Sequence, residues 1–173
     1  MATIVRFLGL LNASVWLGSM VFFTLAVGPG FFSTEMLQLL GRPYAGAAAQ
    51  VILSRYFDAL LWCGILALVH LGVEYFYSGR PINKRLAGLL AALLVVGWAS
   101  GSYIQPKLKD LHLRMHAVQT TAAQKLEAKK SFGRWHGVSQ GINLLALVGV
   151  LVYYWTLTSS PSTGRYNMQM FRN

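Results

Sequence analysis

Four histidines have the widest chemical range in this sequence, because an imidazole can bind a metal, ligate haem or move a proton. His70 precedes Glu74 by about one helical turn within an apolar stretch, so the two side chains project from the same face. The pair could bind a metal or relay a proton, and His70 alone could be an axial ligand of haem b. The structural alternative is that His70 hydrogen-bonds a neighbouring helix while Glu74 reaches a nearby arginine.

His112 and His116 form a second group, on a segment that also carries several lysines. Their separation of four residues would let two imidazoles on one helix share a metal ion. The sequence around them has no HExxH motif and no third ligand close by. The alternative is therefore that both side chains contact only water and lipid headgroups.

A polar strip begins at His136, because His136, Gln140 and Asn143 share one helix face. Ser139 lies beside this face. Polar side chains that enter a membrane must face protein, water or a ligand rather than lipid tails. The strip is therefore either a hydrogen-bonding contact between helices or the lining of a pocket.

No sequence motif points to catalysis, because the chain has no nucleophile elbow, phosphate-binding loop, dinucleotide-binding glycine pattern or zinc-protease motif. We therefore predict that the protein is not an enzyme. We also expect it to bind no cofactor, and the alternative is haem b or copper. The candidate ligands for that alternative are His70, His136, His112 and His116.

The elements that must position these residues are membrane helices. Of the 173 residues, 55% are hydrophobic and 12% are charged, and the mean hydropathy is +0.48. Soluble domains are about a quarter charged, so this chain has too little polar surface to fold in water alone. Crossing a membrane takes about 20 apolar helical residues, and four uncharged stretches are long enough.

These stretches predict an all-α fold, an integral membrane antiparallel four-helix bundle over residues 1–158. The predicted helices are about 4–27, 56–77, 86–105 and 136–157. Between the third and fourth helices, apolar residues recur every three or four positions among lysines, which predicts one amphipathic helical extension over about 107–130. Pro29 and Pro106 are expected to stop the first and third helices, and Gly41–Pro43 is a predicted break. Residues 159–173 are predicted to form a polar C-terminal tail.

Three pairs of small residues spaced four apart predict close helix packing, either within the bundle or with another subunit. The pairs are Ser14 with Gly18, Gly97 with Gly101, and Gly137 with Gly141. Arg55 and Asp58 are three residues apart where the second helix would enter the membrane. They are predicted to form a structural ion pair, which lowers the cost of both charges.

The net charge of +10 is explained by contact between the basic loops and anionic lipid headgroups. Nucleic-acid binding is not expected, because the chain has no soluble basic recognition module. An even number of helices places nine Lys and Arg residues on the side of the larger loops and six on the side of the termini. This distribution favours larger loops in the cytoplasm, and we predict a bacterial-type inner (plasma) membrane.

Three runs of the sequence resemble one family. The runs are Trp16–Phe23, Ser54–Phe57 and Phe132–Ser139, the last followed by Asn143. They are similar to the family grouped with transmembrane protein 205, whose members are four-helix membrane proteins with a domain of unknown function of the DUF4149 type. The resemblance covers about residues 7–154 and implies an architecture rather than an activity. At the level of the fold it extends to the copper-resistance D membrane domain and to HemJ-type protoporphyrinogen oxidases, whose own motifs are not matched here.

We predict a non-catalytic subunit or accessory protein of a larger membrane complex, because almost the whole chain is apolar helix and no catalytic constellation is present. The expected partners are other integral membrane subunits and membrane lipids. The first alternative is a haem b- or copper-binding bundle that handles electrons or metal. The second alternative is a small transporter or lipid-interacting protein built around the polar strip.

Overall fold

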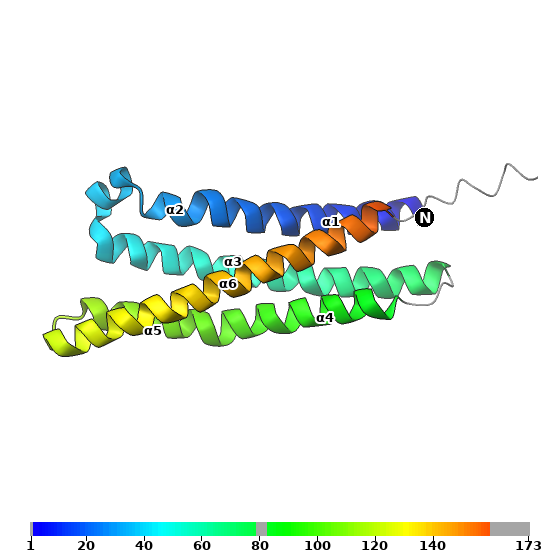
Figure 1. Ribbon diagram of the computed structural model, residues 1–173. Helices are drawn as coiled ribbons and strands as arrows, with labels where there is room; N and C mark the ends of the chain where they lie inside the picture. Colours follow the sequence, from blue (N-terminus) through cyan, green and yellow to red (C-terminus); the bar gives the residue numbers. More distant parts are fainter. Residues whose placement is uncertain (1, 79–82, 160–173) are drawn as a thin grey trace, which may run out of the picture.

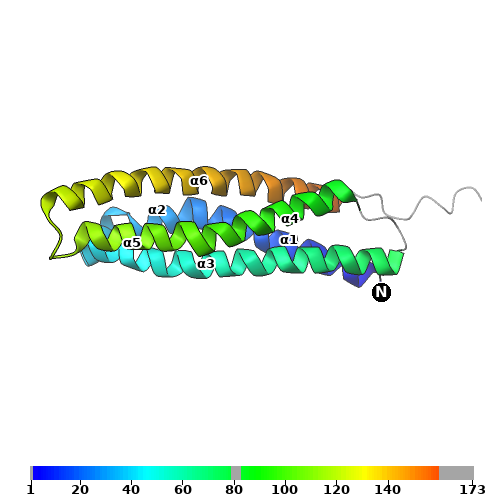
Figure 2. The ribbon, with the colours of Figure 1, turned by 90° about the horizontal axis from the view of Figure 1, so that it is seen from below.

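The computed structural model describes residues 2–78 and 83–159, and these residues are almost entirely helical, with no strand among them. Figures 1 and 2 show one elongated bundle in which the chain passes back and forth along a single long axis. The predicted all-α class is confirmed. The predicted tail beyond Ser159 lies outside the described residues. The elements are α1 (Ala2–Phe22), η1 (Phe23–Val27), α2 (Gly28–Phe31), α3 (Thr34–Ser78), α4 (Lys84–Ala99), η2 (Ser100–Ile104), α5 (Gln105–His116) and α6 (Ala122–Ser159).

Four helical stretches are long and apolar enough to cross a membrane, as predicted. They are Thr3–Phe31, Thr34–Tyr77, Lys84–His116 and Ala122–Ser159. The second and fourth stretches begin earlier than the predicted positions near 56 and 136. A helix does not end at its first charged residue, because side chains outside the hydrocarbon reach water while the backbone stays hydrogen-bonded.

One end of the bundle extends beyond the predicted spans. The 38 residues of α6 correspond to a length of about 57 Å, whereas the hydrocarbon core of a bilayer is about 30 Å thick. We call residues 34–55, 107–116 and 122–134 the basic extension, because nine of the fifteen Lys and Arg residues lie there. Its parts of α3, α5 and α6 lie together at one end of the bundle (Figure 1).

The prediction of one amphipathic helix over 107–130 was wrong, because the chain turns back within this segment. The helix α5 ends at His116, and Ala117 is extended, with a ψ of 138°. Thr121 then begins α6 with a capping box: the backbone N–H of Gln124 donates to Thr121 Oγ1 at 3.3 Å, and the backbone N–H of Thr121 donates to Gln124 Oε1 at 3.0 Å. The amphipathic segment is therefore a helical hairpin.

Neither Pro29 nor Pro106 stops its helix, contrary to the prediction. Each proline comes two residues after a short π-helix, η1 or η2. In a regular α-helix the proline ring clashes with the carbonyl four residues earlier, and a wider π turn relieves that clash while the helix continues. In both places a backbone N–H just before the proline donates to the carbonyl five residues back. These bonds join Gly28 to Phe23 and Gln105 to Ser100.

The predicted break at Gly41–Pro43 is confirmed. Gly41 has a φ of 70° and a ψ of 158°, a conformation that a side chain would strain, and it divides α3 into a short first part and a long second part. The short part, residues 34–40, turns away from the long axis next to the end of α2 (Figure 1).

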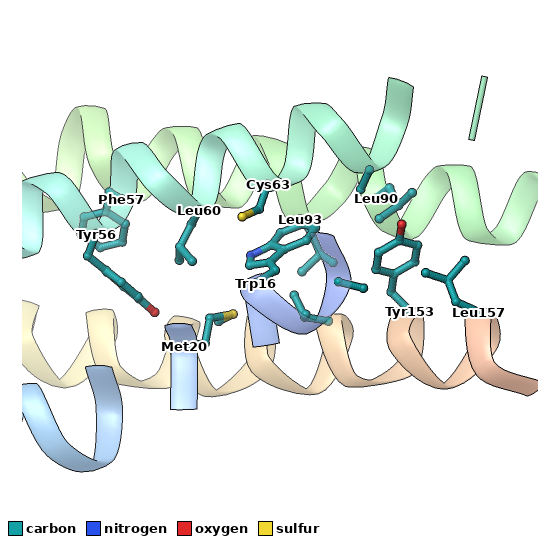
Figure 3. Close-up of a cluster of buried hydrophobic side chains, with 13 residues drawn as sticks. Trp16, Met20, Tyr56, Phe57, Leu60, Cys63, Leu90, Leu93, Tyr153 and Leu157 are labelled. Atoms are coloured by element: carbon teal, nitrogen blue, oxygen red, sulfur yellow. The ribbon is translucent and has the colours of Figure 1, made fainter. Parts of the chain in front are cut away.

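The core is a narrow column of apolar side chains contributed by α1, α3, α4 and α6 (Figure 3). Trp16 and Tyr153 meet edge to face with ring centroids 6.4 Å apart. Many large apolar side chains, including Phe76 and Trp155, instead lie exposed on the outside of the bundle. An apolar exterior around a small core is typical of a helix bundle surrounded by lipid, so the chain is a membrane protein.

Candidate functional site

His70 lies against α1, where its ring packs on Gly9. Its Nε2 atom is 3.0 Å from the backbone carbonyl oxygen of Val5, and with the proton on Nε2 the ring donates to that oxygen. A Cβ atom on Gly9 would lie 2.3 Å from the imidazole, so glycine is what leaves room for the ring. Glu74 follows one turn later on α3 and is half-buried. This is the geometry of a hydrogen bond between helices, and a metal bound through Nε2 would have to displace the Val5 carbonyl.

His112 repeats this arrangement at the other end of the bundle. Its Nε2 atom is 3.0 Å from the backbone carbonyl oxygen of Pro43, which ties α5 to α3. A Cβ atom on Gly46 would lie 2.3 Å from the ring. The His112 side chain is buried, with 7% of the residue exposed. Neither glycine partner was predicted from the sequence, because a contact between helices leaves no spacing signal along either helix.

The His112 ring is the first of four neighbouring rings, and the last two belong to α6. The ring centroids of His112 and His116 are 4.8 Å apart, those of His112 and Phe132 are 6.2 Å apart, and those of Phe132 and His136 are 5.7 Å apart, with the last pair stacked at 9°. Phe132 therefore lies between the His112–His116 pair and His136. Within residues 2–78 and 83–159, no group of three or more His, Cys, Asp or Glu side chains is placed to hold a metal ion. His70 belongs to a different contact, since it packs on Gly9 of α1, whereas His136 stacks on Phe132 of its own helix.

The polar strip on α6 divides into an inward and an outward part. Asn143 faces protein: its Oδ1 accepts from the Tyr56 hydroxyl at 2.8 Å, and its Nδ2 donates to Thr24 Oγ1 at 2.9 Å. His136 and Gln140 are exposed on the outside of the bundle. The strip is therefore a contact between helices only at Asn143.

The Asn143 network joins three helical segments next to a π-helix. Thr24 belongs to η1, and Tyr56 of α3 stacks on Phe23 with ring centroids 4.1 Å apart and an interplanar angle of 16°. A cavity of about 30 Å³, large enough for one water molecule, is lined by Asn143, Ser139, Ser100 and apolar side chains. Asn143 and Ser139 were predicted from the sequence as part of the polar strip, whereas Thr24 was not. Tyr56 was noted only within the family resemblance.

The small residues predicted for helix packing behave differently from one another. A Cβ atom on Gly101 would lie 3.2 Å from Phe57 Cβ, so this glycine does allow a close approach. The Ser14 hydroxyl donates to the Leu10 carbonyl of its own helix at 2.8 Å. The remaining glycines would meet no neighbouring atom within 4 Å if a Cβ were added. They are Gly18, Gly97, Gly137 and Gly141.

Arg55 and Asp58 lie on one face of α3, with 3.8 Å between the guanidinium and the carboxylate. Both side chains are more than half exposed, at 83% and 61%. An ion pair this open to its surroundings stabilises a fold little, so it is a local feature of the helix surface rather than part of a site.

No curated protein and no solved structure is significantly similar to this chain. One family model matches it, over residues 11–117, and that model describes a domain of unknown function, DUF4149. The grouping with transmembrane protein 205 stays a prediction. The matched range begins within α1 and includes α3, α4 and α5, with His70, His112 and Gly46, whereas Gly9, on which His70 packs, precedes it. The chain therefore belongs to the DUF4149 family.

Proposed function

We propose that this protein is a non-catalytic subunit or accessory protein of a larger membrane assembly, and that it docks through the outer face of α6. The observation that carries the proposal is the environment of residues 136–141. His136 and Gln140 are exposed there, and Gly137 and Gly141 have no neighbour within 4 Å of an added Cβ.

A helix of a partner subunit would account for both the exposed polar side chains and the uncovered glycines on this face. A glutamine amide that faces hydrocarbon lacks hydrogen-bond partners, which a second helix can supply. Glycines four residues apart let two helix backbones approach closely, and their dispersion contacts then stabilise the pair. Both features lie on the same few turns of α6, beginning just after Arg134 and Trp135.

Site-directed photo-crosslinking combined with native mass spectrometry tests this proposal. A photoreactive amino acid at Leu144, which is 54% exposed and follows Gln140 by one turn, should crosslink to a partner subunit in the membrane. The matched control is Val15 of α1, which is 52% exposed and should give no such product. A lone monomer in mild detergent, together with equal crosslinking at both positions, would overturn the proposal.

We further propose that the basic extension faces the cytoplasm of a bacterial-type cell. The support is the excess of Lys and Arg on that side, nine against six. Val118 lies in the turn between α5 and α6 and is 96% exposed, while the single native cysteine, Cys63, is buried. A Val118→Cys variant in intact cells should react with a membrane-impermeant maleimide only after permeabilisation, and labelling of intact cells would reverse the orientation.

A second candidate function is metal or haem binding, and the His112–His116 contact favours it. Two imidazoles on one helix with ring centroids 4.8 Å apart could share a copper ion. A haem b group on His70 or His136 would need a second ligand from another chain or from solvent, since His70 packs on Gly9 of α1 and His136 stacks on Phe132 of α6. An optical spectrum and a metal analysis of the purified protein decide between the candidates. We expect neither a Soret band nor bound copper, and a signal lost in His116→Ala or His70→Ala would promote the second candidate.

A further inference from the structure

A groove of about 280 Å³ runs between α4 with η2 on one side and α6 on the other. Figure 1 shows α6 crossing the bundle diagonally, from α5 at one end toward α1 at the other. Its walls are apolar except for one hydroxyl residue, Ser100. The lining includes Leu89, Ala92, Ser100, Ile104, Leu145 and Gly149.

Ser100 marks the inner side of this groove. Only 4% of the residue is exposed, and its hydroxyl is the one polar side chain among the residues that line the groove. Ser100 also lines the cavity of about 30 Å³ that Ser139 and Asn143 border, so it lies where the groove and the cavity meet. A hydroxyl on an otherwise apolar wall can donate a hydrogen bond to a ligand in the groove, which favours a ligand that carries an acceptor.

The end of the groove nearest the basic extension has the features of a membrane interface. Tyr103 and Trp135 meet edge to face there with ring centroids 5.8 Å apart, and they join η2 to α6. Aromatic rings of this kind are enriched at the headgroup level of a bilayer. Lys107 follows the groove residue Ile104 by about one turn and is exposed. A negative headgroup would meet a cation at this point.

We propose that the groove is a specific lipid site that binds one acyl chain of an anionic glycerophospholipid. The chain lies along α4 between Leu89 and Ile104, an ester carbonyl accepts a hydrogen bond from Ser100, and the phosphate lies near Lys107. The groove has about twice the volume of the ~150 Å³ cavity that is known to hold a benzene ring, so it accepts a segment of chain while the rest stays in the bilayer. This site does not depend on the docking role, because a monomer would bind the lipid equally well.

Photo-labelling in vesicles tests the acyl-chain part of the proposal. The probe is phosphatidylglycerol with a diazirine on one acyl chain, diluted in phosphatidylcholine vesicles that contain the full chain. Adducts should concentrate on peptides from α4, η2 and α6 that line the groove. Ala92→Phe, which fills the groove from an exposed position of α4, should reduce them several-fold, whereas the matched control Ala91→Phe, exposed on the same helix but outside the groove, should not.

Native mass spectrometry tests the two polar contacts. Ser100→Ala should reduce the amount of lipid retained in mild detergent several-fold, and Ser102→Ala, an exposed position in the same π-helix, should leave it unchanged. Lys107→Gln should remove the preference for phosphatidylglycerol over phosphatidylcholine, while Lys109→Gln should retain it.

Three results would overturn the lipid site. They are labelling spread evenly over all lipid-facing helices, equal labelling of Ala92→Phe and Ala91→Phe, and copurification of a ring-bearing lipid in place of a phospholipid. The same spectra report the assembly state, so loss of the lipid with the assembly intact separates this proposal from the docking role.

Discussion

The His70–Gly9 and His112–Gly46 contacts solve the same packing problem at the two ends of the bundle. In both, an imidazole lies on a glycine of a neighbouring helix, with Nε2 3.0 Å from a backbone carbonyl. The first ring is half-buried, whereas the second is buried and continues into a row of three more rings. A histidine in a membrane bundle can therefore serve only to hold two helices together. Whether it can also bind a metal ion or haem depends on the side chains around it.

The largest effect is expected from Gly46→Ala. A Cβ atom there overlaps the buried His112 ring, which cannot move without disturbing α5, so we expect a loss of about 2–3 kcal/mol in the free energy of unfolding. Gly9→Ala should cost less, because the half-buried His70 ring has room to move outward. Unfolding in mixed detergent micelles measures both variants against Gly137→Ala, whose Cβ meets no neighbour. Equal stability of all three variants would show that neither histidine needs a glycine beneath its ring.

Between these two contacts, Tyr56 of α3 is hydrogen-bonded to Asn143 of α6, and substitution of Asn143 removes that bond. Asn143→Leu leaves the hydroxyls of Tyr56 and Thr24 without their partner, and should lower the free energy of unfolding by about 1–2 kcal/mol. The matched control is Gln140→Leu, on the outer face of the same helix, which should leave the monomer as stable as the parent chain. If the two variants unfold alike, the inward and outward parts of the strip do not differ in role.

The hydrogen bonds of the two histidines can be compared directly. His112→Phe and His70→Phe each keep a flat ring on the glycine but lose the bond to the carbonyl, which should cost about 0.6 kcal/mol each, a typical value for such bonds between membrane helices. The same unfolding assay measures both variants. A loss several times larger at His112 alone would show that the row of rings, and not the carbonyl bond, gives that histidine its importance.

The smallest effect is expected at Arg55, which belongs to neither contact. Arg55→Ala breaks an exposed ion pair, so the free energy of unfolding should fall by less than about 0.5 kcal/mol. The change in free energy of unfolding of this variant is the reference for an unimportant contact. Differences between the two histidine contacts are significant only when they exceed it. A larger loss would mean that Arg55 holds a contact other than the one with Asp58.

The sequence was sufficient for the number and approximate place of the membrane helices, because runs without charge follow directly from the cost of charge in lipid. It was insufficient for their ends, because a helix can continue through charged residues once it leaves the hydrocarbon. The turn before α6 could have been predicted, since Thr121 and Gln124 carry the capping-box pattern. The regular spacing of apolar residues, considered alone, predicted one long amphipathic helix instead of this turn.

The candidate site was predictable only as single residues. His70 and Asn143 were recognised as polar groups in apolar surroundings, and His112 as one of two possible metal ligands on a basic segment. All three contact a neighbouring helix. Their partners were not predictable, because the register between two helices depends on how they pack. The glycine pairs show the same limit: Gly101 approaches Phe57 closely, whereas Gly97, one turn earlier, meets no neighbour.

The two π-helices limit how far the length of this chain can change, because each one sets the orientation of the helix that follows it. A π turn is an α-helix with one inserted residue, and such an insertion rotates every later side chain by about 100° around the helix axis. The orientation of His112 toward α3 is therefore set upstream, in η2, as much as by α5 itself. Replacing the following proline and deleting one residue together would restore a straight helix, but it would present a different face of α5 to the bundle.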